Sequence, residues 1–405
     1  MIDYDPFSDE ALRDPFPIYR RLREESPVHY IERWDAWALS RFDDIWRAST
    51  DSEHLTTTRG TSSPFLLTKA MAPYPNLNHM DPPEHTKLRK LIAPFFLPRH
   101  VRNMREQIRG FVTQCIDSFI ERGEADVVGE LAQIVAVRMG CLAIGFPEQD
   151  ADYLVDLVGR FMSREEGVEG MTEVGVEAFE EMRGYLERIS DPGRARTSEP
   201  QNPIDAMARA ALEGQIPREE IGQHLALLLI GATETFPKTV GNAVLLLAQH
   251  PDQRAALVAD PAKIPNAWRE CLRLGMPTQF LMRSVVKPFE IRGQKLSPNQ
   301  SVMFMYASAN RDEREFRDPD RFDIQRSSPR ILTFGHGTHR CLGANFAELE
   351  GQLLLEELLR RIPEYEVDLA GSSRHVTEFL QGFDCLPIRF PSAGRERGER
   401  RVRGG

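Results

Sequence analysis

The chain has 405 residues, of which 51 are Lys or Arg and 61 are Asp or Glu, and its formal net charge is −10. This length allows one large domain or two to three smaller ones, each with its own core, and the acidic balance argues against nucleic acid as the main partner. A mean hydropathy of −0.40, an acidic N-terminus and no apolar run near about 18 residues predict a cytoplasmic protein without a signal peptide or a membrane span.

The first 60 residues predict a helix followed by extended structure. Apolar side chains recur at helical spacing before Pro27, and residues 28–39 then alternate around Trp as strands do. Residues 60–80 are rich in Ser, Thr, Pro and Asn, which predicts a long surface loop. Compact domains keep loops of that length mostly for function.

Residues 83–275 are predicted to be mainly helical. Within them, residues 164–188 are acidic and interrupted by Gly, which predicts mobile or solvent-exposed helices. After Met276, short segments separated by Pro and Gly predict strands and turns. The last residues, 392–405, are rich in Arg and Gly and predict a disordered tail.

A locally basic segment lies within this acidic chain. Residues 81–89 read Asp-Pro-Pro-Glu-His-Thr-Lys-Leu-Arg and place His85 and Arg89 four residues apart, on one face of a helix. Taken alone, this pair of residues is best explained as part of a solvent-exposed helix face without a functional role. Between residues 85 and 109 the only acid is Glu106, whereas the basic residues are Lys87, Arg89, Lys90, Arg99, Arg102, Arg105 and Arg109.

The longest predicted helix runs from Pro217 to His250, about 50 Å at 1.5 Å per residue. Its centre reads Gly-Ala-Thr-Glu-Thr-Phe-Pro over residues 231–237, and the small residues leave room for a ligand against the helix. Pro237 removes an N–H, and Thr235 can bond back to the carbonyl of Gly231, so both residues loosen one turn. Taken alone, the stretch fits a kinked core helix equally well.

Two further motifs follow the long helix. Glu270 and Arg273 form an acid–base pair at i, i+3, a spacing that is common by chance and stabilises little when exposed. Residues 319–322 read Pro-Asp-Arg-Phe.

The most specific local signal surrounds Cys341. Residues 334–343 read Phe-Gly-His-Gly-Thr-His-Arg-Cys-Leu-Gly, and a helix with an apolar stripe is predicted to follow and to end before Pro363. A thiol at a helix N-terminus meets N–H groups that favour the thiolate, so the pattern predicts a sulfur ligand of low pKa. The alternative is an inert buried cysteine. The chain has five cysteines and no Cys-x-x-Cys pair, which argues against a disulfide framework, a zinc ribbon or an iron–sulfur cluster.

The pattern Phe-Gly-x-Gly-x-His-x-Cys-x-Gly resembles the haem-ligand signature of the cytochrome P-450 family. The resemblance implies that Cys341 is the axial ligand of the iron in haem b, and thiolate ligation favours O–O cleavage. Residues 231–235 resemble the oxygen-activation motif of the family, which implies that Thr235 stabilises iron-bound dioxygen and Glu234 relays protons. This sequence departs from the common pattern at Ala232 and at Phe236-Pro237.

The same resemblance assigns residues around the haem. It implies propionate contacts by His85, Arg89, Arg283 and His339, and contacts of the cysteine loop through Phe334 and Gly335. The Glu-x-x-Arg and Pro-x-Arg-Phe motifs imply a structural cluster of Glu270, Arg273 and Arg321 that holds the loop of Cys341.

The resemblance implies a mainly α fold with small β-sheets, in which residues 1–391 form a single triangular haem domain. The implied activity is insertion of one atom of dioxygen into a small hydrophobic organic substrate, with electrons from an external ferredoxin and ferredoxin reductase that dock on the basic segment. Two alternatives remain: a peroxide-driven peroxygenase, against which Glu234 and Thr235 count, and a non-catalytic haem-thiolate sensor or carrier. No nucleic acid or membrane partner is expected.

Overall fold

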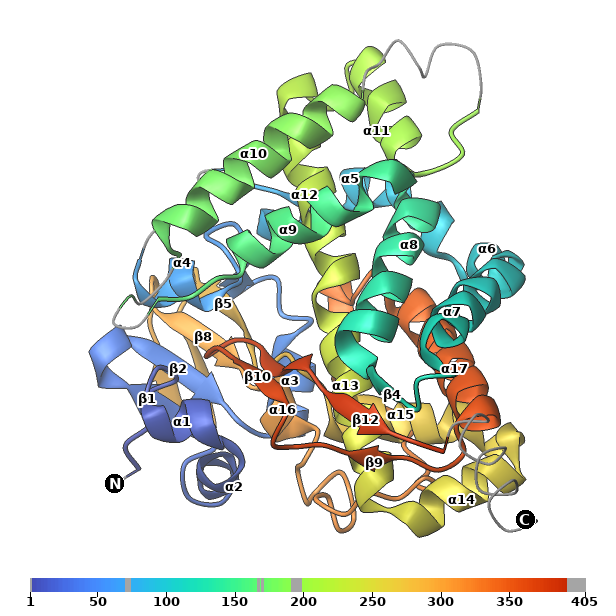
Figure 1. The fold of residues 1–405 in the computed structure, drawn as a ribbon. Helices are drawn as coiled ribbons and strands as arrows, with labels where there is room; N and C mark the ends of the chain where they lie inside the picture. Colours follow the sequence, from blue (N-terminus) through green and yellow to red (C-terminus); the bar gives the residue numbers. More distant parts are fainter. Residues whose placement is uncertain (1, 70–73, 166–167, 169–170, 191–198, 392–405) are drawn as a thin grey trace, which may run out of the picture.

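A computed structural model describes residues 2–69, 74–165, 168, 171–190 and 199–391 of the chain. Helices make up most of the molecule, and the main sheet lies at one edge beside the N-terminal helices (Figure 1). The fold is therefore mainly α with small β-sheets, as predicted. The tail predicted over residues 392–405 lies outside the described residues.

The N-terminal part forms the edge of the molecule. It contains α1 (Asp9–Arg13), α2 (Phe16–Glu25), α3 (Phe42–Ala48) and strands β1 (Val28–Ile31) and β2 (Ala36–Leu39). β1 and β2 pair antiparallel, which confirms the strands predicted over residues 28–39. The sheet has the order β1-β2-β8-β5-β3, with β3 at Leu55–Thr56, β5 at Leu281–Val285 and β8 at Ser301–Phe304. Only the β2–β8 pair in it is parallel.

The helical part occupies the middle of the chain, as expected. Its helices are α4 (Ser63–Leu67), α5 (Glu84–Ile92), α6 (Pro98–Asn103), α7 (Arg105–Phe119), α8 (Gln133–Ile144), α9 (Ala151–Phe161), α10 (Glu173–Ile189), α11 (Pro203–Leu212), α12 (Ile221–Thr233), α13 (Thr235–Gln249), α14 (Pro251–Ala259), α15 (Ile264–Leu274), α16 (Tyr306–Ala309) and α17 (Ala344–Arg361). α17 follows Cys341 and ends before Pro363, which confirms the helix predicted there.

The long helix predicted from Pro217 to His250 is interrupted at the turn that Thr235 and Pro237 were expected to loosen. A 3₁₀ turn precedes α12, and the helix breaks at Glu234 before α13 begins. Pro237 lacks the N–H that would bond the carbonyl of Thr233, and that carbonyl accepts a hydrogen bond from Nε2 of Gln133 instead, at 3.3 Å. A partner from α8 therefore stabilises the break.

One helical segment is more apolar than the sequence reading allowed. Among the described residues, Val127–Ile144 has a mean hydropathy of 1.7 over 18 residues, so the expectation that no run approaches this length was wrong. Of this segment, 67% is buried inside the protein. It consists of a π-helical turn, residues 127–132, followed by α8, and it packs as a core helix.

The remaining strands form three smaller sheets. They are β4 (Glu124–Asp126), β9 (Glu366–Val367) and β12 (Pro387–Arg389) in one sheet, the hairpin β6 (Phe289–Ile291) and β7 (Gln294–Leu296), and the hairpin β10 (Ser373–Val376) and β11 (Gln381–Cys385). β11 lies directly on α13, because a Cβ at Gly382 would come within 2.6 Å of the Cβ of Lys238.

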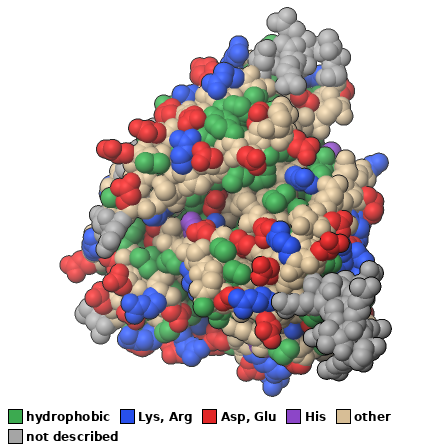
Figure 2. Space-filling model, viewed as in Figure 1, with side chains coloured by type: hydrophobic (Ala, Val, Ile, Leu, Met, Phe, Trp, Pro, Cys, Tyr) green, Lys and Arg blue, Asp and Glu red, His purple; other side chains and the backbone are tan. Residues whose placement is uncertain are grey.

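Two regions that the sequence set apart are the loop predicted over residues 60–80 and the acidic segment over residues 164–188. Described residues of both contain helical turns or pack on neighbouring elements. The loop contains α4 and a 3₁₀ turn at Leu77–His79. The guanidinium of Arg183 on α10 lies 4.4 Å from the ring centroid of Tyr74, and a Cβ at Gly222 would meet the carbonyl of Arg183 at 2.4 Å. α10 therefore packs closely against α12. Figure 2 shows acidic and basic side chains intermingled on the face of the molecule that is seen in Figure 1.

Candidate haem site

The loop before α17 holds Cys341 in a fixed backbone geometry. The N–H of Cys341 donates to the carbonyl of Phe334 at 2.8 Å. Gly335 and Gly337 have φ values of 64° and 74°, which favour glycine. At Gly337 a Cβ would also come within 2.4 Å of the carbonyl oxygen of Ser49. Both glycines predicted to shape this loop are therefore required by their backbone conformation, and Gly337 is required by the lack of space as well.

Cys341 is exposed, and its surroundings act on the thiol in opposite directions. Desolvation by the surrounding protein raises the pKa of the thiol, whereas hydrogen bonds from the backbone of Gly343 and Ala344 and the charges of Arg89 and Arg340 lower it. α17 begins at Ala344, so Cys341 precedes the helix rather than opening it. A coordinated metal cation deprotonates a thiol outright, so a bound metal would give the thiolate expected here.

Four residues predicted to contact propionates gather from different parts of the chain. The ring centroids of His85 and His339 are 4.3 Å apart. His339 Nε2 lies 3.3 Å from Oγ1 of Thr57. Arg89 donates to the carbonyls of Thr338 and Arg340, at 3.4 and 2.5 Å, so it also braces the cysteine loop.

Arg283 on β5 completes this group. It is buried and donates to the carbonyl of Met282 at 2.7 Å, and burial lowers its pKa. Burial, the charge of Arg283 and the neighbouring His85 lower the pKa of His339 to about 3. α5 and β5 thus bring basic side chains to the side of the loop that carries His339.

The donor set fits the anionic edge of a haem. His85 is buried, and within the described ranges neither of its ring nitrogens has a hydrogen-bond partner. A buried polar group without a partner is costly, so an acceptor is expected beside it. Carboxylates such as the two propionates of haem would supply that acceptor beside Arg89 and Arg283.

The broken turn of the long helix provides space on one face. Gly231 is exposed although it lies in the middle of the helix, and a Cβ there would meet no atom within 4 Å. The Thr235 hydroxyl donates to the carbonyl of Gly231 at 3.5 Å, the contact expected from the sequence. Glu234 is buried and forms an ion pair with Lys238 at 2.9 Å. Sequence reasoning missed Lys238, although its i, i+4 spacing from Glu234 could have indicated it.

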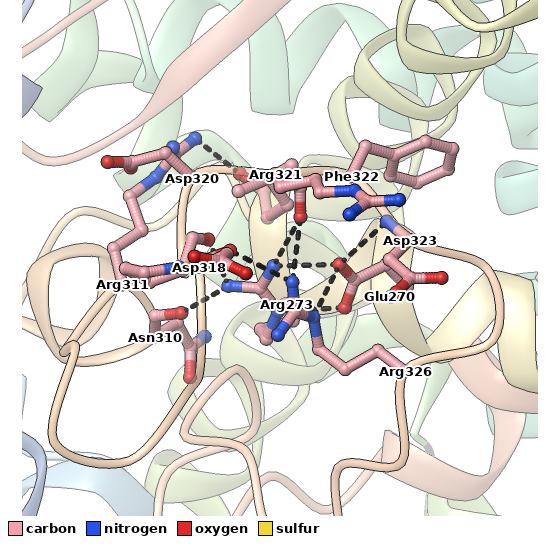
Figure 3. Close-up of polar contacts among 12 residues, drawn as sticks. Glu270, Arg273, Asn310, Arg311, Asp318, Asp320, Arg321, Phe322, Asp323 and Arg326 are labelled. Carbon is pink, nitrogen blue, oxygen red and sulfur yellow. Dashed lines mark hydrogen bonds and ion pairs between the residues drawn. The ribbon is translucent and has the colours of Figure 1, made fainter.

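The Glu270 cluster forms, but with a different third member (Figure 3). Arg273 bonds both carboxylate oxygens of Glu270, at 2.7 and 2.8 Å. The side chain that completes the cluster is Arg326, whose Nε lies 3.0 Å from Glu270 Oε1. Arg321 is exposed and contributes its carbonyl, which accepts from Arg273 and Arg326. Arg321 therefore takes part in the cluster through its backbone rather than its guanidinium, and the side-chain ion pairs with Glu270 are those of Arg273 and Arg326.

The cluster is linked to the cysteine loop through Asn310. Arg273 donates to the carbonyl of Asn310 at 2.7 Å. The Asn310 side chain accepts from the N–H of Leu332 and donates to the hydroxyl of Thr333, at 2.8 and 2.9 Å. Because Thr333 adjoins Phe334, this hydrogen-bond path reaches the start of the loop, as the sequence interpretation required.

The basic segment flanks the same loop. Nδ2 of Asn345, at the start of α17, donates to the carbonyl of Phe96 at 2.8 Å. Of the basic residues, those whose side chains lie exposed are Lys87, Lys90, Arg99 and Arg102. Arg109 instead pairs with Glu356 and Glu357 on α17, so it holds two helices together.

Comparisons with known proteins agree with this arrangement. The pattern of the family described as Cytochrome P450 matches residues 264–379. The chain is 30% identical to the cytochrome P450 monooxygenase PikC of Streptomyces venezuelae, over 99% of this chain and 96% of that protein. It is 31% identical to the 20-oxo-5-O-mycaminosyltylactone 23-monooxygenase of Streptomyces fradiae, over 91% and 88%. The crystal structure of CalO2 superposes with a TM-score of 0.85 at 28% identity, over 97% of this chain and all of that one.

Proposed function

The chain belongs to the cytochrome P450 family and is a monooxygenase, and from this premise we propose that it inserts one oxygen atom of dioxygen into a small hydrophobic substrate. In this proposal Cys341 is the axial ligand of haem b. The bound haem would supply the activation of dioxygen. The observation that carries the proposal is the pairing of a fixed Cys341 loop with a buried His85 whose ring nitrogens have no partner among the described residues.

The propionate-binding role falls on His85, Arg89, Arg283 and His339. A neutral imidazole offers one N–H donor, and an arginine offers a charged one, so these residues would bind a carboxylate by charge-assisted hydrogen bonds. Phe334 and Gly335 would line the haem edge through the cysteine loop.

The oxygen-handling role falls on Thr235 and Glu234. Thr235 carries a hydroxyl at the open face of the broken turn, and its bond to the Gly231 carbonyl is long, at 3.5 Å. By rotating away from that carbonyl, the hydroxyl can donate instead to a small ligand above Gly231. Glu234 is buried one residue earlier and can hold or give a proton. Their adjacency supports a monooxygenase over the peroxygenase alternative.

The electron donor is proposed to be an external ferredoxin reduced by a ferredoxin reductase. The exposed residues Lys87, Lys90, Arg99 and Arg102 lie on the elements that flank the cysteine loop and would steer an acidic donor toward it. We also propose that residues 1–391 form a single domain and that the protein works in the cytoplasm.

The substrate is proposed to be a largely apolar molecule. We propose that its binding site draws on Leu227, Ile230, Met303 and Met305, since apolar linings of this kind select by shape. A structure with a TM-score of 0.82 is described as P450BioI in complex with hexadec-9Z-enoic acid ligated acyl carrier protein. A ligand screen should therefore include carrier-bound as well as free acids, scored by the low-to-high spin shift.

The direct experiment compares Thr235→Ala with Thr239→Ala, using a ligand found in that screen and generic redox partners. Thr239 lies one turn later, and its hydroxyl donates to the carbonyl of Thr235. Thr235→Ala is expected to keep consuming NADH while product per NADH falls at least about tenfold, because a positioned proton donor contributes that much or more. Product formed from peroxide at an unchanged rate in Thr235→Ala would favour the peroxygenase. NADH consumption that never yields product would favour the sensor or carrier.

A further inference from the structure

A pocket of about 510 Å³ opens beside the break in the long helix. The end of α9, the broken turn and the hairpin β10–β11 line it, and its titratable side chains are Arg164, Glu234, Lys238, Arg374, His375 and Asp384. A water molecule occupies roughly 30 Å³ in the liquid, so the pocket has room for on the order of ten waters. Asp384 is 52% exposed, so this pocket connects the helix break with solvent.

A continuous set of polar contacts crosses the pocket wall. Lys238 Nζ lies 2.9 Å from Oε2 of Glu234 and 3.6 Å from Oδ1 of Asp384. Asp384 Oδ1 in turn lies 3.2 Å from Nδ1 of His375. The side chains of Glu234 and Lys238 are only 11% and 6% exposed, so the set runs from a buried acid to the surface.

Two features of Asp384 and His375 favour a path through water in the pocket. Burial raises the pKa of Asp384, but the hydrogen bond and charge of His375 and the charge of Lys238 lower it further, so this carboxylate is ionised at neutral pH. Nε2 of His375 is buried and has no partner among the described residues, and a water in the pocket would satisfy it.

The other cations of the pocket are directed elsewhere. Arg164 donates to the carbonyls of Met162 and Ser163 and lies 3.8 Å from Glu378. The guanidinium of Arg374 lies 5.5 Å from the ring centroid of Phe383. Among the pocket's cations described above, Lys238 is therefore the one that contacts Glu234. The close packing of Gly382 on Lys238 keeps β11 beside Lys238.

We propose that this pocket is the proton inlet of the active site and that Lys238 is a positioning residue that holds Glu234 toward it. Water in the pocket carries a proton from bulk solvent to Glu234, and His375, oriented by Asp384, binds that water through Nε2. The inference rests on the proposed function, in which substrate RH, dioxygen, two protons and two electrons from the external donor give ROH and one water. Both protons of that balance would pass this way.

The test uses the holoenzyme with a spin-shifting ligand and compares His375→Gln and Lys238→Met with the wild type. Both variants are expected to lower product per NADH at least about fivefold, since the acid loses its proton supply. Lys238→Arg should restore coupling. The matched control is His29→Gln, a partly buried histidine on β1 next to Ser26, which should behave as wild type.

A second readout does not need turnover. Urea unfolding of the substrate-free protein is measured for Lys238→Met, Glu234→Gln and the double variant. If Lys238 holds Glu234, the two changes are non-additive by at least tenfold in the unfolding equilibrium constant, about 1.4 kcal/mol, because each single change leaves a buried group unpaired. Additive effects would overturn the positioning role.

The outcomes separate this inference from the proposed function. If Thr235→Ala uncouples while His375→Gln and Lys238→Met keep wild-type coupling, the inlet is wrong and the proposed function stands. If Thr235→Ala also leaves coupling unchanged, the proposed proton transfer at the broken turn is wrong. The proposed proton inlet would then be rejected as well.

Discussion

The imidazole rings of His85 and His339 lie with their centroids 4.3 Å apart, although one belongs to α5 and the other to the loop before Cys341. Burial and the charge of Arg89 lower the pKa of His85, so the ring is neutral at pH 7 and can donate one N–H. That donor has no acceptor among the described residues. The proposed propionate contact would give that donor its acceptor.

Haem retention tests this contact. His85→Phe is expected to speed haem transfer to apomyoglobin at least about tenfold, because a hydrogen bond to a charged group contributes roughly 1.5 to 3 kcal/mol. His85→Gln, which keeps a donor, should lose haem more slowly than His85→Phe. His29→Phe is the control on a distant strand. Equal transfer rates for His85→Phe and wild type would exclude a propionate contact by His85.

The Glu270 cluster predicts unequal costs for two nearby arginines. Arg326→Gln should lower the free energy of unfolding by about 3 kcal/mol or more, because it removes a buried ion-pair partner of Glu270 and leaves carbonyls unpaired. Arg321→Gln, at an exposed side chain, should cost about 0.5 kcal/mol or less. Urea unfolding of both variants measures the difference. A larger cost at Arg321 would contradict the assignment of Arg326.

The docking surface predicts a salt-dependent effect. The double variant Arg99→Glu/Arg102→Glu should slow reduction by an acidic ferredoxin about tenfold at low ionic strength, and the difference should shrink as salt is added. The control is Arg317→Glu, whose parent side chain is 95% exposed. Arg109 is unsuitable for this purpose, because its ion pairs join α7 to α17. Unchanged stopped-flow reduction rates in the double variant would contradict docking there.

His224, which is buried, and His79, which is half-buried, predict how stability depends on pH. Burial lowers the pKa of His79 and of His224 to about 4, and the neighbouring His79 contributes at His224. The unfolded chain takes up protons at these positions near pH 6.5 and the folded chain does not. Their contribution to the free energy of unfolding is therefore complete above about pH 6.5 and declines toward pH 4, by up to roughly 1.4 kcal/mol per pH unit for each histidine.

Denaturant titrations at several pH values measure that slope. His224→Gln should reduce it by roughly 1.4 kcal/mol per pH unit in this range, whatever the variant does to stability at neutral pH. An unchanged slope in His224→Gln would mean that His224 titrates normally in the folded protein.

Local sequence patterns predicted the main features that depend on neighbouring residues. The glycines around Cys341, the helix after it and the hydrogen bond from Thr235 to Gly231 all follow from short-range sterics and hydrogen bonding. The clustering of His85 with Arg283 and His339 came from the family resemblance, since no local rule brings α5 and β5 to one loop.

What the sequence missed depends on tertiary contacts. Arg321 and Arg326 both lie near the Pro-x-Arg-Phe segment, and only the folded loop decides which guanidinium faces Glu270. The break at Glu234 requires Gln133 from another helix to take up the freed carbonyl of Thr233. The pKa of Cys341 depends on how much desolvation opposes the backbone donors, a balance that composition does not contain.

The central claim is that Cys341 supplies a thiolate ligand to haem iron. The most direct measurement is the absorption spectrum of the reduced protein with bound carbon monoxide, for the wild type and for Cys341→His. The wild type should give the long-wavelength Soret band that thiolate ligation produces, and Cys341→His should give the band of an imidazole-ligated haem. A wild-type spectrum typical of histidine ligation, or the same spectrum in both proteins, would contradict the account.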